Sequence, residues 1–345
     1  MKTLIKPPKL NIGDKVAAIT NSAALASVFP HQYEFGKKQL EDVFGLKVVE
    51  TPNALKSNEE LYNNPKLRAD DLMWAFQNPE IKAIVSIIGG DDCIRLLPYV
   101  DFEIIKKNPK IFMGYSDPTS IHFMCYSAGL SSIYGPTIMA GFGENAGLFP
   151  YTIDIIKRTL FSREPIGLIS PTNEWTEELL DWSNPDNSKK QRKRIKNEGP
   201  NVLQGEKIIQ GHLLGGCFEV LLMCLNTKIA PVKTDWDGAI LFIEMSEDTP
   251  PENIFLYWLR NLATQGIIQK LNGIILGRPK NANGNMQLYE KALLTVAKET
   301  HREDLTIMTR MDFGHTDPMF LIPYGATAEI NPIKKTFSIL DSAVI

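Results

Sequence analysis

Short apolar runs alternate with helix-like stretches through the first half of this chain of 345 residues. Each run is apolar at nearly every position, and not only at every second one, which is typical of parallel strands covered by helices on both faces. The sequence therefore predicts an α/β fold whose N-terminal domain contains a parallel sheet. The expected elements are strands at 16–20, 46–50, 81–88 and 110–113 and helices at 31–44 and 66–77.

The alternation is interrupted between 166 and 205 and then resumes. Prolines and asparagines break any long element there, and the basic run 189–196 is typical of a solvated surface. We therefore predict an N-terminal domain at 1–165, a connector or surface hairpin at 166–205, and a C-terminal domain at 206–345. In the last of these we expect strands at 208–214, 239–243, 273–276 and 305–309, helices at 215–225, 251–265 and 288–299, and a closing hairpin of 326–330 and 337–339.

Charge, hydropathy and cysteine spacing argue against several classes of protein. A net charge of -3 argues against a broad surface for nucleic acid or anionic membranes. The apolar runs are shorter than the ~18–20 residues that span a bilayer, and the first residues lack the apolar core of a secretory signal. The four cysteines show no C-x-x-C pair and no metal-ligand spacing. We therefore expect a cytoplasmic protein with reduced cysteines and without a metal, nucleic-acid or membrane partner.

Ser116 lies at an abrupt change from strand to helix. The strand at 110–113 ends at Gly114, and Asp117 as N-cap followed by Pro118 as first helical residue predicts a helix start. Such a turn exposes a hydroxyl at the carboxyl edge of the sheet and points the next backbone N–H at the group under attack. The pattern predicts a nucleophile elbow.

A serine hydroxyl is a weak nucleophile at neutral pH and needs a neighbouring base, which a third group must orient. His315 lies in a short loop after the predicted strand 305–309, with a glycine before it and a proline shortly after. Such a loop can present an imidazole at the end of a strand, so we predict that His315 is the base. The other histidines are expected at solvated helix ends (His31, His301), beneath the serine turn (His122) and within a strand (His212).

Glu244 is the predicted orienting acid. It ends the strand at 239–243, and the carboxyl ends of strands are where the active sites of α/β proteins gather. For the neighbouring Glu247 and Asp248 we expect capping or salt-bridging roles instead. The sequence thus predicts a triad in the chain order Ser, Glu, His.

An oxyanion hole requires two backbone N–H donors, and the N–H of Asp117 is one candidate. The loop Gly89-Gly90-Asp91 follows the predicted strand 81–88 and offers the other at Gly90, because paired glycines let the backbone approach a ligand closely. A plain tight turn is the alternative. The loop matches neither G-x-G-x-x-G nor a Walker A pattern, which argues against a phosphate-loop enzyme.

Six short motifs in this order and spacing resemble the LD-carboxypeptidase family of serine peptidases over almost the whole chain. The resemblance implies that Ser116 is the nucleophile, His315 the base and Glu244 the acid, with the glycine turn in the oxyanion hole and no metal or other cofactor. It also implies that a smaller, β-rich C-terminal α/β domain contributes acid and base, with the active site in the interdomain cleft, and it suggests a homodimer. The motifs lie at 9–14, 89–90, 114–117, 211–216, 242–244 and 314–315.

Two branches of this family differ in substrate. Murein LD-carboxypeptidases remove the terminal D-alanine from the tetrapeptide stem of peptidoglycan during recycling, whereas microcin C immunity proteins cut an amide-like bond between an aminoacyl group and a modified nucleotide. The long segment between Ser116 and Glu244 resembles the second branch, in which a tryptophan of this region stacks on the adenine. Trp182 is the better positional match and Trp175 the second choice; packing within the protein or across a dimer is the alternative for both.

One position departs from the family pattern. Many members have an asparagine after the Gly-Gly of the second domain, where it can contact substrate, but Cys217 follows Gly215 and Gly216 here. We expect Cys217 at a substrate subsite, together with Gly89 and Asp91. The expected partner is a small-molecule substrate, either a peptide or an aminoacyl nucleotide.

Two other functions fit parts of the pattern. An α/β-hydrolase esterase shares the order serine, acid, histidine, but its elbow has a second glycine, where this chain has Pro118. A non-catalytic module that binds nucleotides or peptidoglycan fragments could use the same scaffold. The sequence therefore favours a serine amide hydrolase of the microcin C immunity type, with the murein carboxypeptidase as first alternative.

Overall fold

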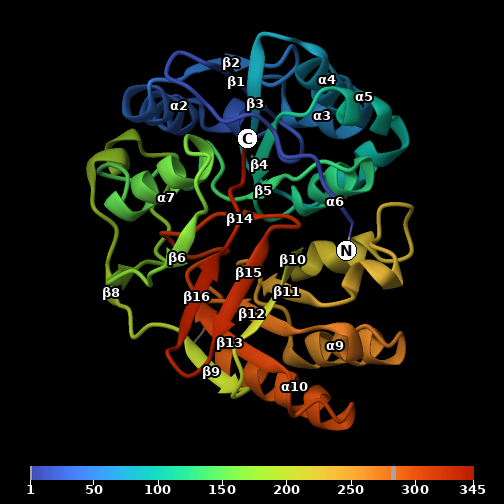
Figure 1. Ribbon diagram of the computed structural model, residues 1–345. Helices are drawn as coiled ribbons and strands as arrows, with labels where there is room; N and C mark the ends of the chain where they lie inside the picture. The colour runs from blue at the N-terminus through green and yellow to red at the C-terminus, as the bar shows by residue number, and fades with distance from the viewer. Residues whose placement is uncertain (1, 281–284) are drawn as a thin grey trace.

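The N-terminal half folds around a sheet whose central strands are parallel, as the apolar runs predict. The computed structural model describes residues 2–280 and 285–345, and Figure 1 shows this half in blue to green. The strand order is β14-β5-β4-β3-β1-β2, in which only β14 runs antiparallel to its neighbour among the described strands. The strands are β1 (Lys15–Ile19), β2 (Lys47–Glu50), β3 (Ile81–Ser86), β4 (Ile111–Gly114), β5 (Ile133–Tyr134) and β14 (Ile322–Pro323).

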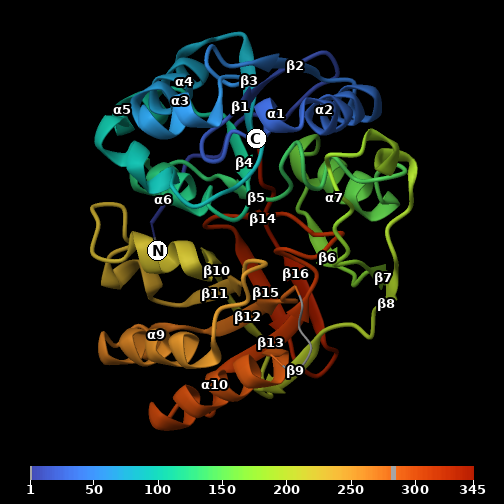
Figure 2. The same cartoon turned by 180° about the vertical axis from the view of Figure 1, so that it is seen from behind.

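Helices pack on both sides of this sheet, with α2 on one side and α4 and α5 on the other in both views (Figures 1 and 2). The two ends of α2 are determined by residues of its own sequence. Pro30 fits the first turn, where no N–H is needed, and Gly45 adopts the left-handed conformation that ends the helix. The helices are α1 (Leu25–Val28), α2 (Pro30–Phe44), α3 (Asn58–Asn63), α4 (Pro65–Gln77), η1 (Cys93–Tyr99), α5 (Phe102–Lys107), α6 (Thr119–Ala128) and α7 (Pro150–Leu160).

The C-terminal half folds around a larger mixed sheet, shown mostly in yellow to red in Figure 1. Its order is β6-β16-β15-β10-β11-β12-β13-β9, with β10 to β13 parallel and the outer strands antiparallel. The predicted second, β-rich α/β domain is therefore confirmed. Its elements are β6 (Gly167–Ile169), β9 (Asn201–Gln204), β10 (Ile209–Cys217), α8 (Phe218–Cys224), η3 (Lys233–Trp236), β11 (Ala239–Glu244), α9 (Glu252–Thr264), η4 (Ile268–Lys270), β12 (Gly273–Gly277), α10 (Asn285–Glu299), β13 (Thr306–Met311), β15 (Thr327–Asn331) and β16 (Thr336–Ile339).

The segment 166–205 adds strands to the second sheet. β6 pairs with β16 and β9 with β13, while β7 (Glu174–Trp175) and β8 (Ile195–Lys196) form a separate hairpin and η2 covers Pro185–Lys189. Its basic run is not solvated throughout, so that prediction is wrong in part: Arg192 and Arg194 form ion pairs with the buried Glu144. The charges alone could not reveal a partner that lies so far away in the chain. The division of the chain at 165 and 205 stays a prediction.

The sequence predicts that Gly215 and Gly216 open a helix, and this prediction is wrong. Both glycines continue β10. A Cβ atom on Gly215 would lie 1.8 Å from the carbonyl oxygen of Phe242 in the adjacent β11. The close approach of these two strands requires glycine. α8 therefore begins only at Phe218.

The chain ends tie the two halves together. β14 lies far along the chain but joins the first sheet, and the backbone of Ile345 exchanges hydrogen bonds with Pro7 and Lys9. None of the helices in the described ranges is both long enough and apolar enough to cross a membrane.

Candidate active site

The turn after β4 holds Ser116 in a strained backbone conformation. Its φ of 68° lies in the left-handed region, which side chains other than glycine rarely adopt. The Ser116 N–H donates to the hydroxyl of Tyr134 at 3.0 Å, and the Ser116 carbonyl accepts from the N–H of Thr119 at 2.9 Å. These bonds hold the side chain at the carboxyl end of the parallel sheet, in the geometry of a nucleophile elbow.

Ser116, His315 and Glu244 form one hydrogen-bonded chain. The Ser116 Oγ lies 3.1 Å from His315 Nε2, and Nδ1 of the same ring lies 2.6 Å from Glu244 Oε2. Glu244 ends β11 and its side chain is fully buried, whereas that of His315 is 7% exposed. The structure thus brings together three residues that are far apart in the sequence. In this arrangement the imidazole can take a proton from the serine hydroxyl.

Carboxylates on two sides determine the protonation of His315. Burial lowers the pKa of this imidazole, but Glu244, then Glu247 and Glu219, outweigh burial and raise it to about 9. Glu247 Oε2 lies 3.2 Å from Nε2, the ring nitrogen that also faces Ser116. The predicted salt-bridging role of Glu247 therefore involves the predicted base itself.

Tyr134 connects the acid to the nucleophile and was missed by the sequence analysis. Its buried hydroxyl donates to Glu244 Oε1 and accepts from the Ser116 N–H. Tyr134 belongs to β5, a strand of only two residues beside β4. No motif marks this position, because its two partners come from different sheets.

Asp117 is not the N-cap of a helix, so this part of the prediction is wrong. α6 begins at Thr119 with Pro118 as its N-cap residue. The Asp117 carboxylate instead accepts hydrogen bonds from the Ser22 hydroxyl and from the N–H groups of Asp92 and Cys93, at 2.5, 2.9 and 2.7 Å. These donors from distant segments bind the carboxylate in place of the N–H groups at the start of the helix. Asp117 thereby connects the loop after β3 to the serine turn.

The glycine loop lies directly against Ser116. A Cβ atom on Gly89 would be 3.0 Å from Ser116 Cβ, and one on Gly90 would be 2.3 Å from Ser22 Oγ. Glycine is thus needed at both positions. A buried ion pair between Arg68 and Asp92, with N–O distances of 2.6 and 2.7 Å, braces the loop from behind. The oxyanion-hole role of Gly90 and Asp117 stays a prediction.

Ser116 opens into a cavity of about 240 Å³ that residues of both halves line, which we call the serine cavity. Cys217 reaches its wall from the end of β10, and its thiol lies 3.2 Å from Glu219 Oε2. Asp91 also lines the wall, and its contact with substrate stays a prediction. The polar and small residues of the lining include Gly89, Gly90, Asp91, Ser116, Cys217, Glu219, Ser246, Glu247, Asp248 and His315.

A second cavity of about 490 Å³ adjoins the first and shares Tyr115, Glu247 and His315 with it; we call it the tryptophan cavity. Trp182 lines it, with its ring edge-to-face against Phe29 at a centroid distance of 6.0 Å. One wall also contains the ion pairs of Arg192 with Glu144 and Asp317. The two cavities together give the site room for two parts of a substrate.

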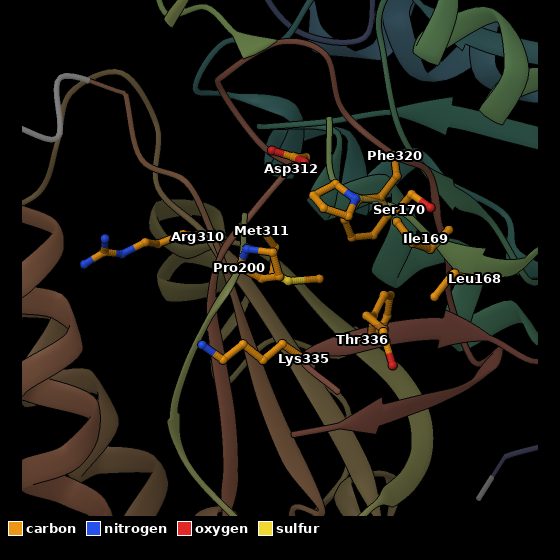
Figure 3. A pocket seen from close by; sticks show the side chains of 12 residues that line it. Leu168, Ile169, Ser170, Pro200, Arg310, Met311, Asp312, Phe320, Lys335 and Thr336 are labelled. Carbon is orange, nitrogen blue, oxygen red and sulfur yellow. The ribbon is translucent and has the colours of Figure 1, made fainter. Parts of the chain in front are cut away.

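Trp175 is not brought to either cavity. Its ring lies under the guanidinium of Arg278, at 4.7 Å, in a separate pocket that residues 195–199 and Arg310 also line. Another pocket, between β6, β13 and β16, contains Asp312 and Lys335 but none of the triad (Figure 3). Neither pocket is part of the candidate site.

Three of the four remaining histidines, His31, His122 and His212, have side-chain contacts with the rest of the protein. His122 is buried beneath the serine turn, as predicted, and contacts the Gly114 carbonyl and Ser132 Oγ at 2.9 and 2.8 Å. Burial lowers its pKa to about 3, so it stays neutral. His212 lies in β10, as predicted. His31 is half-buried and contacts the backbone carbonyl of Trp182, so the prediction that it is solvated is wrong, whereas His301 is exposed, as predicted. Within residues 2–280 and 285–345, no group of histidines, cysteines and carboxylates is arranged to hold a metal.

Comparison with known families matches both halves of the chain. Residues 16–135 match the model of the LD-carboxypeptidase N-terminal domain, and residues 210–330 match that of the LD-carboxypeptidase C-terminal domain. The first range includes Ser116, and the second includes Glu244 and His315. The matched ranges therefore contain the whole hydrogen-bonded triad.

Full-length relatives belong to both functional branches. The microcin C7 self-immunity protein MccF of Escherichia coli is 28% identical, over 96% of this chain and 94% of its own. A probable murein peptide carboxypeptidase of Bacillus subtilis is also 28% identical, over 96% and 93%.

Solved structures share the fold over nearly the whole length. An MccF-like protein from Streptococcus pneumoniae in complex with AMP has a TM-score of 0.86 and 29% identity, and covers 95% of this chain and 98% of its own. MccF in complex with aspartyl sulfamoyl adenosine has a TM-score of 0.87 and 26% identity, over 99% and 100%.

Proposed function

Because this chain belongs to the LD-carboxypeptidase family and is a hydrolase, we propose that it cleaves an amide bond with Ser116 as nucleophile. The observation that supports this most directly is the chain of hydrogen bonds from Ser116 through His315 to Glu244. Its order is that of a nucleophile, a base and an orienting acid. We also propose a cytoplasmic homodimer without a cofactor, as the sequence predicts.

The reaction proceeds through an acyl-enzyme. His315 takes the proton of Ser116 as Oγ attacks the carbonyl carbon, and the resulting oxyanion is held by backbone N–H groups at Gly90 and Asp117. His315 then returns the proton to the leaving nitrogen, and the C–N bond breaks. A water then loses a proton to His315 and attacks the ester carbonyl. As the C–O bond to Ser116 breaks, His315 returns that proton to Oγ and the acid is released.

We propose an aminoacyl nucleotide as the substrate. The nucleotide part occupies the tryptophan cavity against Trp182, and the aminoacyl part occupies the serine cavity. The complexes of related proteins with AMP and with aspartyl sulfamoyl adenosine support this division. Base stacking on an aromatic ring gives about 1–3 kcal/mol per base.

A murein tetrapeptide is the second candidate, and the charge of the tryptophan cavity favours it. Glu144, Glu178 and Asp181 line this cavity, and its Arg192 is already paired with two carboxylates. A phosphate would meet these like charges, with Lys280 as a further cation of the lining, whereas the amide groups of a peptide backbone carry no net charge.

Side-by-side assays of the purified protein separate these functions. Mass spectrometry of the products would follow an aminoacyl sulfamoyl adenosine, a murein tetrapeptide and a simple aryl ester. We expect cleavage of one of the first two and no turnover of the ester. Rapid turnover of the ester alone would favour an ordinary esterase. No cleavage, together with no labelling of Ser116 by a fluorophosphonate, would favour a non-catalytic binding module.

The pH profile tests the assignment of His315 as base. Since the base must be neutral, and carboxylates raise the pKa of His315 to about 9, we expect kcat/KM to increase with pH up to about this value. Glu247→Gln removes one of the charges that raise this pKa, so the rising limb of the plot of kcat/KM against pH should move to lower pH. Glu303→Gln, an exposed carboxylate outside both cavities, is the control. A limb that Glu247→Gln leaves unchanged would contradict the assignment.

Tyr134→Phe tests the link between acid and nucleophile. The change removes a donor to Glu244 and an acceptor for the Ser116 N–H. We expect kcat to fall about 10- to 100-fold, the range for one hydrogen bond to a charged group, with KM little changed. Tyr324→Phe is the matched control, because its buried hydroxyl donates to the Gly215 carbonyl. Equal losses of kcat in the two variants would show a general packing effect instead.

A further inference from the structure

His315 differs from the other two triad residues because it stands on a loop. Ser116 lies in the tight turn after β4, and Glu244 is the last residue of β11. His315 lies between β13 and β14, where residues 312–321 cross from the second sheet to the first. A catalytic group on a loop is positioned less precisely than one on a strand, and a displacement of about 1 Å can cost on the order of 100-fold in rate. Contacts that hold this loop therefore bear on the proposed reaction.

Arg192 binds this loop two residues after the imidazole. Its Nη2 lies 2.8 Å from Asp317 Oδ2, and the same nitrogen pairs with Glu144. The Arg192 Nε donates to Oε1 of Glu144 at 3.2 Å, and Nη1 donates to the backbone carbonyl of Glu178 at 3.1 Å. All three nitrogens of the guanidinium are thus used, in a planar fork that a lysine cannot reproduce.

The side chains of Arg192, Glu144 and Asp317 form a nearly buried cluster. That of Arg192 is 10% exposed, that of Glu144 1% and that of Asp317 19%. Both carboxylates contact the same guanidinium nitrogen, Nη2. Without Arg192 they would face each other, and a buried charge that loses its partner is strongly destabilising. Loss of the guanidinium would therefore displace Asp317, and with it the loop that contains His315.

The residues that Arg192 joins come from different parts of the chain. Glu144 lies between β5 and α7, Arg192 belongs to the segment 166–205, and Asp317 belongs to the loop of the base. The backbones of Thr176 and Asp317 also exchange hydrogen bonds of 2.8 and 3.0 Å. The segment 166–205 thus holds this loop through its main chain and through a side chain of its basic run.

We propose that Arg192 is a positioning residue for the base, which acts through Asp317 to hold His315 beside Ser116. The inference rests on the proposed hydrolysis at Ser116. Among the contacts of the described residues, no hydrogen bond or ion pair joins Arg192 to a triad residue. Arg194 provides the contrast, because it lies 3.7 Å from Glu144 Oε1 and over the ring of Phe149 but forms no ion pair with Asp317 within the described ranges.

Arg192→Gln and Arg194→Gln are the matched pair of variants. Each removes a positive charge beside Glu144, but only the first removes the arginine that pairs with Asp317. We expect Arg192→Gln to lower kcat on the order of 100-fold and Arg194→Gln to leave kcat close to the wild-type value. Arg192→Lys keeps the charge without the planar fork and should lie between the two. Equal losses in Arg192→Gln and Arg194→Gln would overturn the proposal.

A small probe separates positioning from a contact with substrate, because Arg192 also lines the tryptophan cavity. A fluorophosphonate with short alkyl groups reacts with Ser116 beside His315 without filling that cavity. Its labelling rate should fall with Arg192→Gln by a factor similar to the loss of kcat, and should stay close to the wild-type rate with Arg194→Gln. A wild-type labelling rate in Arg192→Gln would show that the guanidinium acts on the substrate alone and would overturn the proposal.

Asp317→Asn tests the route through the loop and decides the question even if Arg192→Gln does not fold. It breaks the same link but leaves no buried charge unpaired, because Glu144 still pairs with Arg192. We expect the labelling rate to fall at least about tenfold, the lower end for a hydrogen bond between charged groups. The double variant should lose no more than Arg192→Gln alone. A wild-type labelling rate in Asp317→Asn, or losses that add in the double variant, would overturn the proposal.

Titration of His315 by NMR separates this inference from the proposed reaction, since it requires no turnover; His315→Gln identifies the signal. Burial lowers the pKa of His315, but Glu244 above all raises it, to about 9, so an imidazole displaced from this carboxylate should have a lower pKa. Loss of the Arg192 charge by itself would raise the pKa of His315 instead.

The direction of the change therefore decides. A lower pKa of His315 in Arg192→Gln and Arg192→Lys, but not in Arg194→Gln, supports the positioning even if the wild type hydrolyses none of the substrates, in which case only the proposed reaction fails. An unchanged or higher pKa in the Arg192 variants would overturn the positioning while leaving any observed hydrolysis intact.

Discussion

Ser116→Ala is expected to reduce kcat by about 10⁴- to 10⁶-fold, the loss found when a serine hydrolase is deprived of its nucleophile. In the proposed mechanism the side chain supplies the atom that forms the acyl-enzyme, and its Oγ is the group that faces His315 Nε2. Residual activity would come from substrate binding and the oxyanion hole. The measurement is kcat and KM on the substrate that the wild type cleaves.

The same substitution should have little effect on folding. The backbone bonds that hold the turn, from Ser116 N–H to Tyr134 and from Thr119 N–H to Ser116, do not involve the removed hydroxyl. Thermal unfolding should therefore be close to that of the wild type. Ser120→Ala, also near the start of α6 but buried away from both cavities, is the matched control and should keep its activity. A Ser116→Ala protein that retains more than about a tenth of wild-type kcat would exclude the acyl-enzyme mechanism.

The parts of the site that were predictable are those with a local signal. Ser116, Glu244 and His315 each stand at or just after the carboxyl end of a buried strand or in the loop that follows it. In a parallel sheet those ends gather at one edge, so the order of elements predicts that Glu244 and His315 lie near one another in the second sheet. Ser116 follows a strand of the first sheet, and its approach to His315 depends on how the two sheets pack together. The strands themselves were predictable because their burial on both faces makes them apolar throughout.

The parts that were missed depend on contacts between distant segments. Tyr134 joins Glu244 across 110 positions, and β14 reaches the first sheet from the end of the chain. Arg192 looked like a solvated charge because its partner Glu144 lies in another element. Asp117 had the local features of a cap, but tertiary donors bind its carboxylate instead. A pattern in the sequence reports propensity, and these residues are placed by tertiary structure.

Glu244→Gln is expected to lower kcat about 10⁴-fold, as when the acid of such a triad becomes an amide. The carboxylate accepts the Nδ1 proton of His315 at 2.6 Å, which leaves Nε2 free to accept the serine proton. An amide that presents its NH₂ group to Nδ1 favours the opposite tautomer, with the proton on Nε2. In that tautomer the ring cannot deprotonate Ser116. The substitution keeps the size of the side chain and opens no cavity. The expected fall in kcat therefore results from the lost charge and the altered position of the proton.

The pH profile distinguishes this role from a structural one. Glu244 is the foremost group that raises the pKa of His315, so its loss should move the limb of kcat/KM well below pH 9 while kcat stays low. Glu290→Gln is the control: Glu290 is a buried carboxylate that binds Arg310 and Thr309, and its change should reduce stability without moving the limb. The contrary result would be a Glu244→Gln protein that loses stability as Glu290→Gln does and keeps both its kcat and the pH of the rising limb of kcat/KM. That result would make Glu244 a structural partner of the loop, and another group would have to orient the imidazole.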